Sequence, residues 1–271
     1  MRRSRIQRTW LILLMLLIIL LVWHFLRPAL LPEGPSNALG HYLLLIAQET
    51  ILFGVPALFL RPWQSQGVRC LPRWRQGCLL ALPTGAVLAL TLSPISAGWA
   101  SLMHVAPQET PLPATALEWA LMILAMAIVP ALMEEAFFRG GVLCGLARGV
   151  GGKAAFALTA AIFTLMHGRL VALPAHLACG ALFTLGMLRY GSLWPPILTH
   201  VSYNATTLAL AWVGVTLPWL SLAATVPAMA AIVAAMLRRT VWYGREPLRF
   251  EDAALGAAAM LVLIVYFLVQ L

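Results

Sequence analysis

Charged side chains are scarce in this chain of 271 residues: they make up 10% of the sequence, whereas hydrophobic residues make up 62%. Soluble globular domains carry about 25% charged residues, so this composition excludes a soluble core. Several apolar runs reach the roughly 20 residues that a helix needs to cross a bilayer. The sequence therefore predicts an all-α fold, a polytopic transmembrane helix bundle.

Cysteine motifs are also missing. The four cysteines are Cys70, Cys78, Cys144 and Cys179, and no two of them have CxxC spacing. Their placement within or beside apolar segments argues against a thiolate metal site and against a disulfide framework. We therefore predict buried thiols.

No Gly/Ser linker, low-complexity tract or repeat of 20 to 50 residues divides the chain, so we predict a single transmembrane domain over residues 1–271. About nine apolar segments are expected to be helices, or eight if the proline-broken third segment is not a span. Their approximate bounds are 10–26, 41–60, 78–103, 116 to the Glu134-Glu135 pair, 153–167, 173–188, 192–213, 217–237 and 253–271.

The formal net charge of +9 comes from short arginine-rich clusters between apolar runs, not from one basic face. We therefore expect contacts with membrane lipids and no nucleic acid. The clusters fall in alternate loops, which predicts a cytoplasmic N-terminus and, with nine spans, an external C-terminus. The expected location is the bacterial inner (cell) membrane. The basic residues used are Arg2, Arg3, Arg5, Arg8, Arg61, Arg69, Arg73, Arg75, Arg148, Lys153, Arg189, Arg238, Arg239, Arg245 and Arg249.

Two adjacent carboxylates and an arginine, Glu134, Glu135 and Arg139, interrupt the fourth apolar segment. Ionisable groups inside a membrane span are costly and usually mark function. Glu135 and Arg139 are four residues apart and share a helix face, whereas Glu134 is turned about 100° away. We therefore predict an ion pair between Glu135 and Arg139 that leaves Glu134 free for another partner. Pro130, one turn earlier, is expected to kink the helix and open it near the carboxylates.

His167 lies at the end of the next apolar segment. The strongest turn signal of the region, residues 149–152, lies midway between Glu134 and His167. A hairpin about this turn would bring the two side chains to matching depth, roughly 21 Å along the helix. That depth is inside a hydrocarbon layer of about 30 Å. Glu134 and His167 would then face each other and hold one water between them.

His200 and Asn204 form a third polar position, four residues apart and on one helix face. Pro195 and Pro196 precede them in the first helical turn, where proline is tolerated. His200 is roughly 14 Å along its helix from Gly191, a depth compatible with that of the other two positions.

Three short motifs, EExxxR, FxxxH and HxxxN, thus follow one another on three separate predicted helices. Their residues are Glu134, Glu135, Arg139, Phe163, His167, His200 and Asn204. In this order they resemble the CPBP family (Abi family), the CaaX-processing and bacteriocin-processing intramembrane proteases, which include the Rce1-like CaaX proteases. The resemblance spans about residues 116–210, which would form the catalytic core.

The resemblance implies an endopeptidase of the glutamic type, without a cofactor, that cleaves a peptide or protein near a membrane-anchored or lipidated segment. Glu134 and His167 would activate a water, and His200 with Asn204 would stabilise the oxyanion. Donors aimed at developing negative charge supply much of the acceleration in such reactions. The supporting residues implied by the same motifs are Glu135, Arg139 and Phe163.

Three alternatives remain. Glu134, His167 and His200 would be the ligands of a zinc-dependent version of the same protease, although there is no HExxH and Arg139 places a cation beside the site. A catalytically silent membrane protein of bacteriocin-immunity or regulatory type would need none of these residues. A proton or solute pathway would use buried acids, but no inverted repeat with paired broken helices is visible.

The remaining intramembrane polar residues are interpreted as structural. Glu49 is expected to form a hydrogen bond across helices, with Arg139 as a candidate partner, and not to be catalytic. A lone membrane histidine is more often a core residue than a catalyst, and this interpretation applies to His24, His41, His104 and His176.

Overall fold

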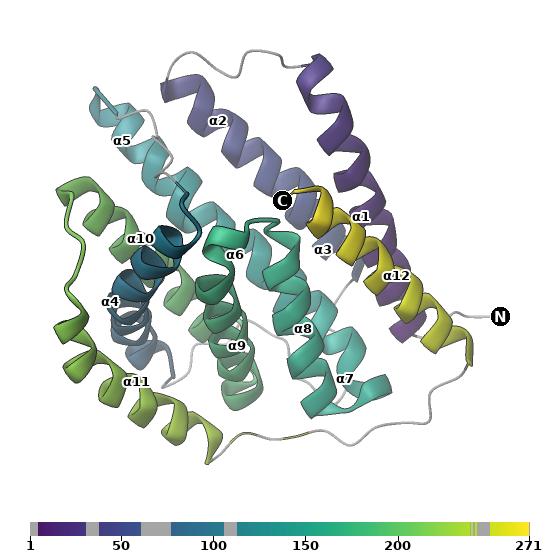
Figure 1. The fold of residues 1–271 in the computed structure, drawn as a ribbon. Coiled ribbons are helices and arrows are strands. Elements are labelled where there is room, and N and C mark those ends of the chain that lie inside the picture. Colours follow the sequence, from purple (N-terminus) through teal and green to yellow (C-terminus); the bar gives the residue numbers. More distant parts are fainter. Residues whose placement is uncertain are drawn as a thin grey trace.

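The structure, a computed structural model, describes residues 5–30, 38–60, 77–105, 113–238, 240, 242 and 250–270. Throughout these ranges the regular secondary structure is helical and contains no strand. The predicted all-α fold is therefore confirmed, and Figure 1 shows the helices gathered into one bundle.

Each of the nine predicted apolar segments corresponds to a helical stretch, and two of these stretches contain π-helical turns. The stretches are α1 (Arg5–Leu30); α2 (Ala38–Glu49), η1 (Thr50–Gly54) and α3 (Val55–Leu60); α4 (Gly77–Leu102); α5 (Ala116–Ile123), η3 (Leu124–Ile128), α6 (Val129–Glu135), η4 (Ala136–Leu143) and α7 (Cys144–Val150); α8 (Gly152–Met166); α9 (Leu173–Tyr190); α10 (Trp194–Val213); α11 (Leu222–Leu237); and α12 (Phe250–Val269). Short 3₁₀ turns, η5 (Leu170–Ala172) and η6 (Trp219–Ser221), precede α9 and α11.

Seven of the described stretches are long and apolar enough to cross a membrane, as expected of an integral membrane protein. The apolar helix α8 is shorter, with 15 residues. Helix α10 has 20 residues but is not among the seven, because its polar side chains lower its hydropathy. The two helices that carry the second and third motifs are thus the least typical spans.

The N-terminal and C-terminal helices α1 and α12 lie side by side (Figure 1). Gly256 of α12 faces the indole of Trp10, where a Cβ atom would lie about 3.0 Å from the ring. At the other end of the pair, Gln270 is hydrogen-bonded to His24 at 2.9 Å. This contact supports the structural interpretation of His24.

Helix α10 is packed closely against α4. A Cβ atom added to Gly85 of α4 would collide with the backbone carbonyl of Thr199 and with the side chain of Ser202. The Ser202 hydroxyl donates a hydrogen bond of 2.7 Å to the carbonyl of Leu82. This contact fixes the position of α10 and hence of His200.

The long stretch from α5 to α7 is not a regular α-helix. The π-helical segments η3 and η4 flank α6 on both sides, and Pro130 lies in the first turn of α6. Proline has no N–H group to donate, and π-helical turns occur frequently at functional sites. The stretch is therefore irregular, with one π-helical segment before the two carboxylates and a second one after them.

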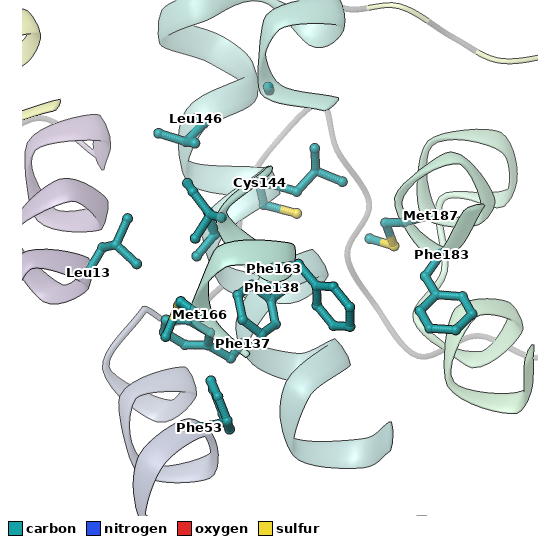
Figure 2. Close-up of a cluster of buried hydrophobic side chains, with 14 of the residues drawn as sticks. Leu13, Phe53, Phe137, Phe138, Cys144, Leu146, Phe163, Met166, Phe183 and Met187 are labelled. Atoms are coloured by element: carbon teal, nitrogen blue, oxygen red, sulfur yellow. The ribbon is translucent and has the colours of Figure 1, made fainter. Parts of the chain in front are cut away.

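Phenylalanines from three stretches form an aromatic cluster beside α6, shown in Figure 2. Phe53 lies 5.7 Å from Phe137 and 5.5 Å from Phe138, measured between ring centroids. Phe138 in turn makes an edge contact with Phe163 at 5.1 Å. Such tilted and edge-on contacts are the favoured geometries of aromatic pairs. The cluster connects the helix of the two carboxylates to α8.

Cys78 and Cys179 are buried free thiols, as predicted, but Cys144 is disulfide-bonded, which corrects the prediction for that residue. Sequence spacing cannot reveal a pairing between residues that only folding brings together.

Of the basic residues used to predict the membrane topology, the following lie outside the described residues: Arg2, Arg3, Arg61, Arg69, Arg73, Arg75, Arg239, Arg245 and Arg249. The membrane orientation stays a prediction.

Candidate active site

The two carboxylates at the end of α6 are buried and have different partners. Glu135 forms an ion pair with Arg139, with 2.7 Å between Oε1 and Nη1, and both side chains are completely buried. This is the ion pair expected from the four-residue spacing. The Oε2 atom of Glu134 is also buried and makes no hydrogen bond within the described residues. Glu134 is thus the carboxylate left for another partner.

The guanidinium group of Arg139 is held by polar atoms of α9 as well as by Glu135. Its Nη2 donates to the carbonyl of Gly180 at 3.0 Å, and its Nε donates to the hydroxyl of Thr184 at 3.4 Å. The central carbon of the guanidinium group lies over the ring of Phe163, 4.5 Å from the ring centroid. Cation–π contacts of this kind stabilise a desolvated arginine. Arg139 therefore ties α6 and η4 to α9.

His167 approaches Glu134 from the end of α8. The chain reverses between α7 and α8 at Gly151, whose φ of 84° favours glycine, so the predicted hairpin is present. The Nε2 atom of His167 lies 3.7 Å from Oε2 of Glu134. The side chain of His167 remains 23% exposed, whereas that of Glu134 is 6% exposed.

The orientation of the His167 ring is set by its own helix. Its Nδ1 atom lies 2.6 Å from the carbonyl oxygen of Phe163. A carbonyl oxygen only accepts, so Nδ1 carries the proton and donates. In the neutral ring, Nε2 then carries the lone pair that faces Glu134. Phe163, the first residue of the FxxxH motif, thus fixes both the position and the tautomer of His167.

His200 approaches the same pair of carboxylates from α10, but its partner is Glu135. Its Nδ1 atom lies 3.0 Å from Oε1 of Glu135, and its ring stacks on that of Phe183 with the centroids 4.6 Å apart. The motif spacing did not predict this contact with Glu135. Asn204 is half-buried one turn further along α10 and has no hydrogen-bond partner in the described part of the chain.

Two residues interpreted as structural lie at the site. The ring of His176 on α9 packs against that of His167, with 4.0 Å between centroids. Glu49 is at the end of α2, which packs against α6, the helix that carries Glu134. The hydrogen bond considered between Glu49 and Arg139 is not formed; the buried Oε2 atom of Glu49 has no partner among the described residues. Neither residue belongs to a motif, so sequence spacing gave no signal for it.

The arrangement does not fit the zinc-ligand set considered above. Across the described ranges, no group of three or more His, Cys, Asp or Glu side chains is placed to bind one ion. Glu134 and His167 face each other, whereas His200 contacts Glu135, the carboxylate that also pairs with Arg139. A catalytic zinc site needs three protein ligands around one point.

Comparison with known proteins gives one finding. Residues 116–206 match the family described as type II CAAX prenyl endopeptidase Rce1-like. The matched part begins with α5 and ends within α10, so it contains all three motifs. No curated protein and no solved structure matches the chain.

Proposed function

We propose that this chain is an endopeptidase that hydrolyses a peptide bond near a membrane-anchored or lipidated segment, because residues 116–206 match the family described as type II CAAX prenyl endopeptidase Rce1-like. The observation that carries the proposal is the separation of 3.7 Å between Glu134 Oε2 and His167 Nε2. Two hydrogen-bond acceptors at this distance do not bond to each other, but one water molecule is able to donate a hydrogen bond to each.

In the proposed reaction, this water is the nucleophile. Its oxygen attacks the carbonyl carbon of the scissile peptide bond while its proton passes to Glu134. His167, held by the carbonyl of Phe163, keeps its lone pair on the water and orients it. When the tetrahedral intermediate collapses, the C–N bond breaks and Glu134 returns the proton to the leaving amine. General acid–base catalysis of this kind contributes typically about 10²- to 10⁴-fold.

His200 and Asn204 are proposed to stabilise the oxyanion of the tetrahedral intermediate. The Nδ1–H group of His200 donates to Glu135, so the ring is able to donate from Nε2 only as the imidazolium ion. The carboxylate of Glu135 supplies the counter-charge for that ion. Asn204 offers an amide without a hydrogen-bond partner among the described residues. Preorganised donors of this type are typically worth about 10²- to 10³-fold each.

The zinc-dependent alternative has less support, because the described residues provide no set of three ligands. The proposed substrate is inferred from the family match, and the membrane setting is inferred from the apolar composition. We propose a peptide or protein substrate with a membrane-proximal terminus, cleaved in contact with membrane lipids. The proposed setting is the bacterial inner membrane with the N-terminus in the cytoplasm.

The test is cleavage by the purified full-length protein in liposomes. Two reporter peptides share one sequence. One carries a farnesylated cysteine three residues before its C-terminus, and the other replaces the lipid by a transmembrane anchor. Mass spectrometry of the fragments is expected to reveal a single cut near the anchor in at least one reporter. His167→Ala is expected to abolish the cut, whereas His41→Ala, a control on α2, should cleave like the wild type.

The opposite results would count against hydrolysis. If neither reporter is cut, or if His167→Ala cuts as fast as the wild type while both proteins accumulate equally, the protease proposal is wrong. A silent immunity or regulatory protein would then be the better explanation.

A further inference from the structure

We propose that His176 is a substrate-binding residue of this site, which donates a hydrogen bond from Nε2 to a backbone carbonyl of the bound peptide. This inference rests on the proposed protease function and adds to it a contact that lies outside the three motifs. The inference is based on the position of the ring, on the absence of a hydrogen-bond partner among the described residues, and on the chemistry that a peptide offers.

Two neighbouring rings, those of His167 and Phe163, define the position of the His176 ring. The centroid of the His176 ring lies 4.0 Å from that of His167, and the two rings are inclined by 34°. The ring of Phe163 lies 6.4 Å away and is nearly perpendicular to that of His176. His176, on α9, therefore packs against the ring of His167, the imidazole proposed to orient the water.

His176 has no hydrogen-bond partner in the part of the chain that the structure describes. Its Nδ1 atom is completely buried and makes no hydrogen bond, whereas Nε2 is also unbonded but is not completely buried. Most buried polar atoms in proteins are hydrogen-bonded, and each exception needs an explanation. The other histidines at the site satisfy this rule, because His167 and His200 each have a partner for Nδ1.

The tautomer follows from the difference between the two nitrogen atoms. A buried donor without an acceptor is rarer than a buried acceptor without a donor, so we assign the proton to Nε2. The N–H group then lies on the nitrogen of the ring that is not completely buried. Every peptide substrate has backbone carbonyl oxygens, which are strong acceptors. A carbonyl next to the scissile bond would satisfy Nε2 and align the peptide along the site.

The test compares four variants of the full-length protein in the liposome assay, using a reporter that the wild type cleaves. His176→Phe keeps a ring to pack against His167 but has no donor. His176→Gln places an amide donor where Nε2 lies, and His176→Asn places its amide where Nδ1 lies. His41→Phe is the matched control, since His41 on α2 contacts Tyr42 and lies outside the site.

We expect His176→Phe and His176→Asn to raise KM about tenfold, the effect of losing one hydrogen bond to substrate, with kcat within about twofold of the wild type. His176→Gln and His41→Phe should keep the wild-type KM. If His176→Phe does not accumulate, the inference is tested by comparing the KM of His176→Asn with that of His176→Gln. A wild-type KM in both the Phe and the Asn variants would show that the ring only packs, and would overturn the inference while the cleavage itself still supports the protease.

Discussion

The Nδ1 atom of His200 lies 3.0 Å from Oε1 of Glu135, the same oxygen atom that receives the ion pair from Arg139 at 2.7 Å. One carboxylate oxygen thus joins a buried cation on η4 to a histidine on α10. The second carboxylate of the motif, which the sequence suggests only as a supporting residue, is therefore a direct partner of a proposed oxyanion donor. This relationship separates the roles of Glu134 and Glu135: the first faces the water, and the second holds His200.

Arg139→Ala should strongly destabilise the protein, because it leaves the completely buried Glu135 without its cation. Breaking a buried ion pair on one side typically costs about 3–5 kcal/mol. The measurement is thermal unfolding of the purified protein in detergent. Arg189→Ala is the control, since within the described residues Arg189 makes a cation–π contact with Tyr190 and no ion pair. Equal losses of stability in the two variants would contradict a buried ion pair at the site.

The double variant Glu135→Gln with Arg139→Ala should regain part of that stability, because no uncompensated charge remains buried. Its activity should stay low. Without the carboxylate, His200 has no counter-charge as an imidazolium ion, so kcat is expected to fall by about 10²-fold or more, with little change in KM. Steady-state kinetics in liposomes checks this. A double variant that is both stable and fully active would show that Glu135 does not act through His200.

Gly85→Ala should reduce both stability and activity, because the added methyl group would meet the backbone of Thr199 and push α10 away from α4. Overpacking of a close contact typically costs about 1–3 kcal/mol. Gly186→Ala on α9 is the matched control, since no atom lies within 4 Å of the added Cβ. The unfolding temperature and the cleavage rate should both fall in Gly85→Ala, and neither should fall in Gly186→Ala. If Gly85→Ala behaves like Gly186→Ala, α10 is not positioned through this contact.

Chelation should leave the cleavage rate unchanged, because the described residues offer no three-ligand group for a metal. The experiment adds 1,10-phenanthroline to the liposome assay and measures the metal content of the purified protein by mass spectrometry. Loss of activity that zinc restores would favour the metalloprotease alternative.

Local spacing was sufficient to predict several parts of the site. The interval of four residues between Glu135 and Arg139 predicted their ion pair. The turn signal near Gly151 predicted the hairpin that brings His167 to Glu134. Both are consequences of helix geometry within one or two neighbouring helices.

Contacts between distant helices could not be predicted in this way. The hydrogen bond between His200 and Glu135 and the packing of His176 on His167 depend on how α9 and α10 are rotated against α6 and α8. A single sequence contains no periodic signal for such rotations. The wide π-helical turns on both sides of α6 also change the direction of side chains relative to an ideal helix.

The most direct test of the account is the cleavage rate of Glu134→Gln in liposomes, measured beside Glu251→Gln, a control whose carboxylate lies on α12 and contacts Gln7. Glutamine keeps the shape of Glu134 but cannot take a proton from water. We expect Glu134→Gln to accumulate normally and to cleave the reporter about 10³-fold or more slowly, while Glu251→Gln should cleave at the wild-type rate. Cleavage by Glu134→Gln at the wild-type rate would contradict the central claim that Glu134 and His167 activate the water.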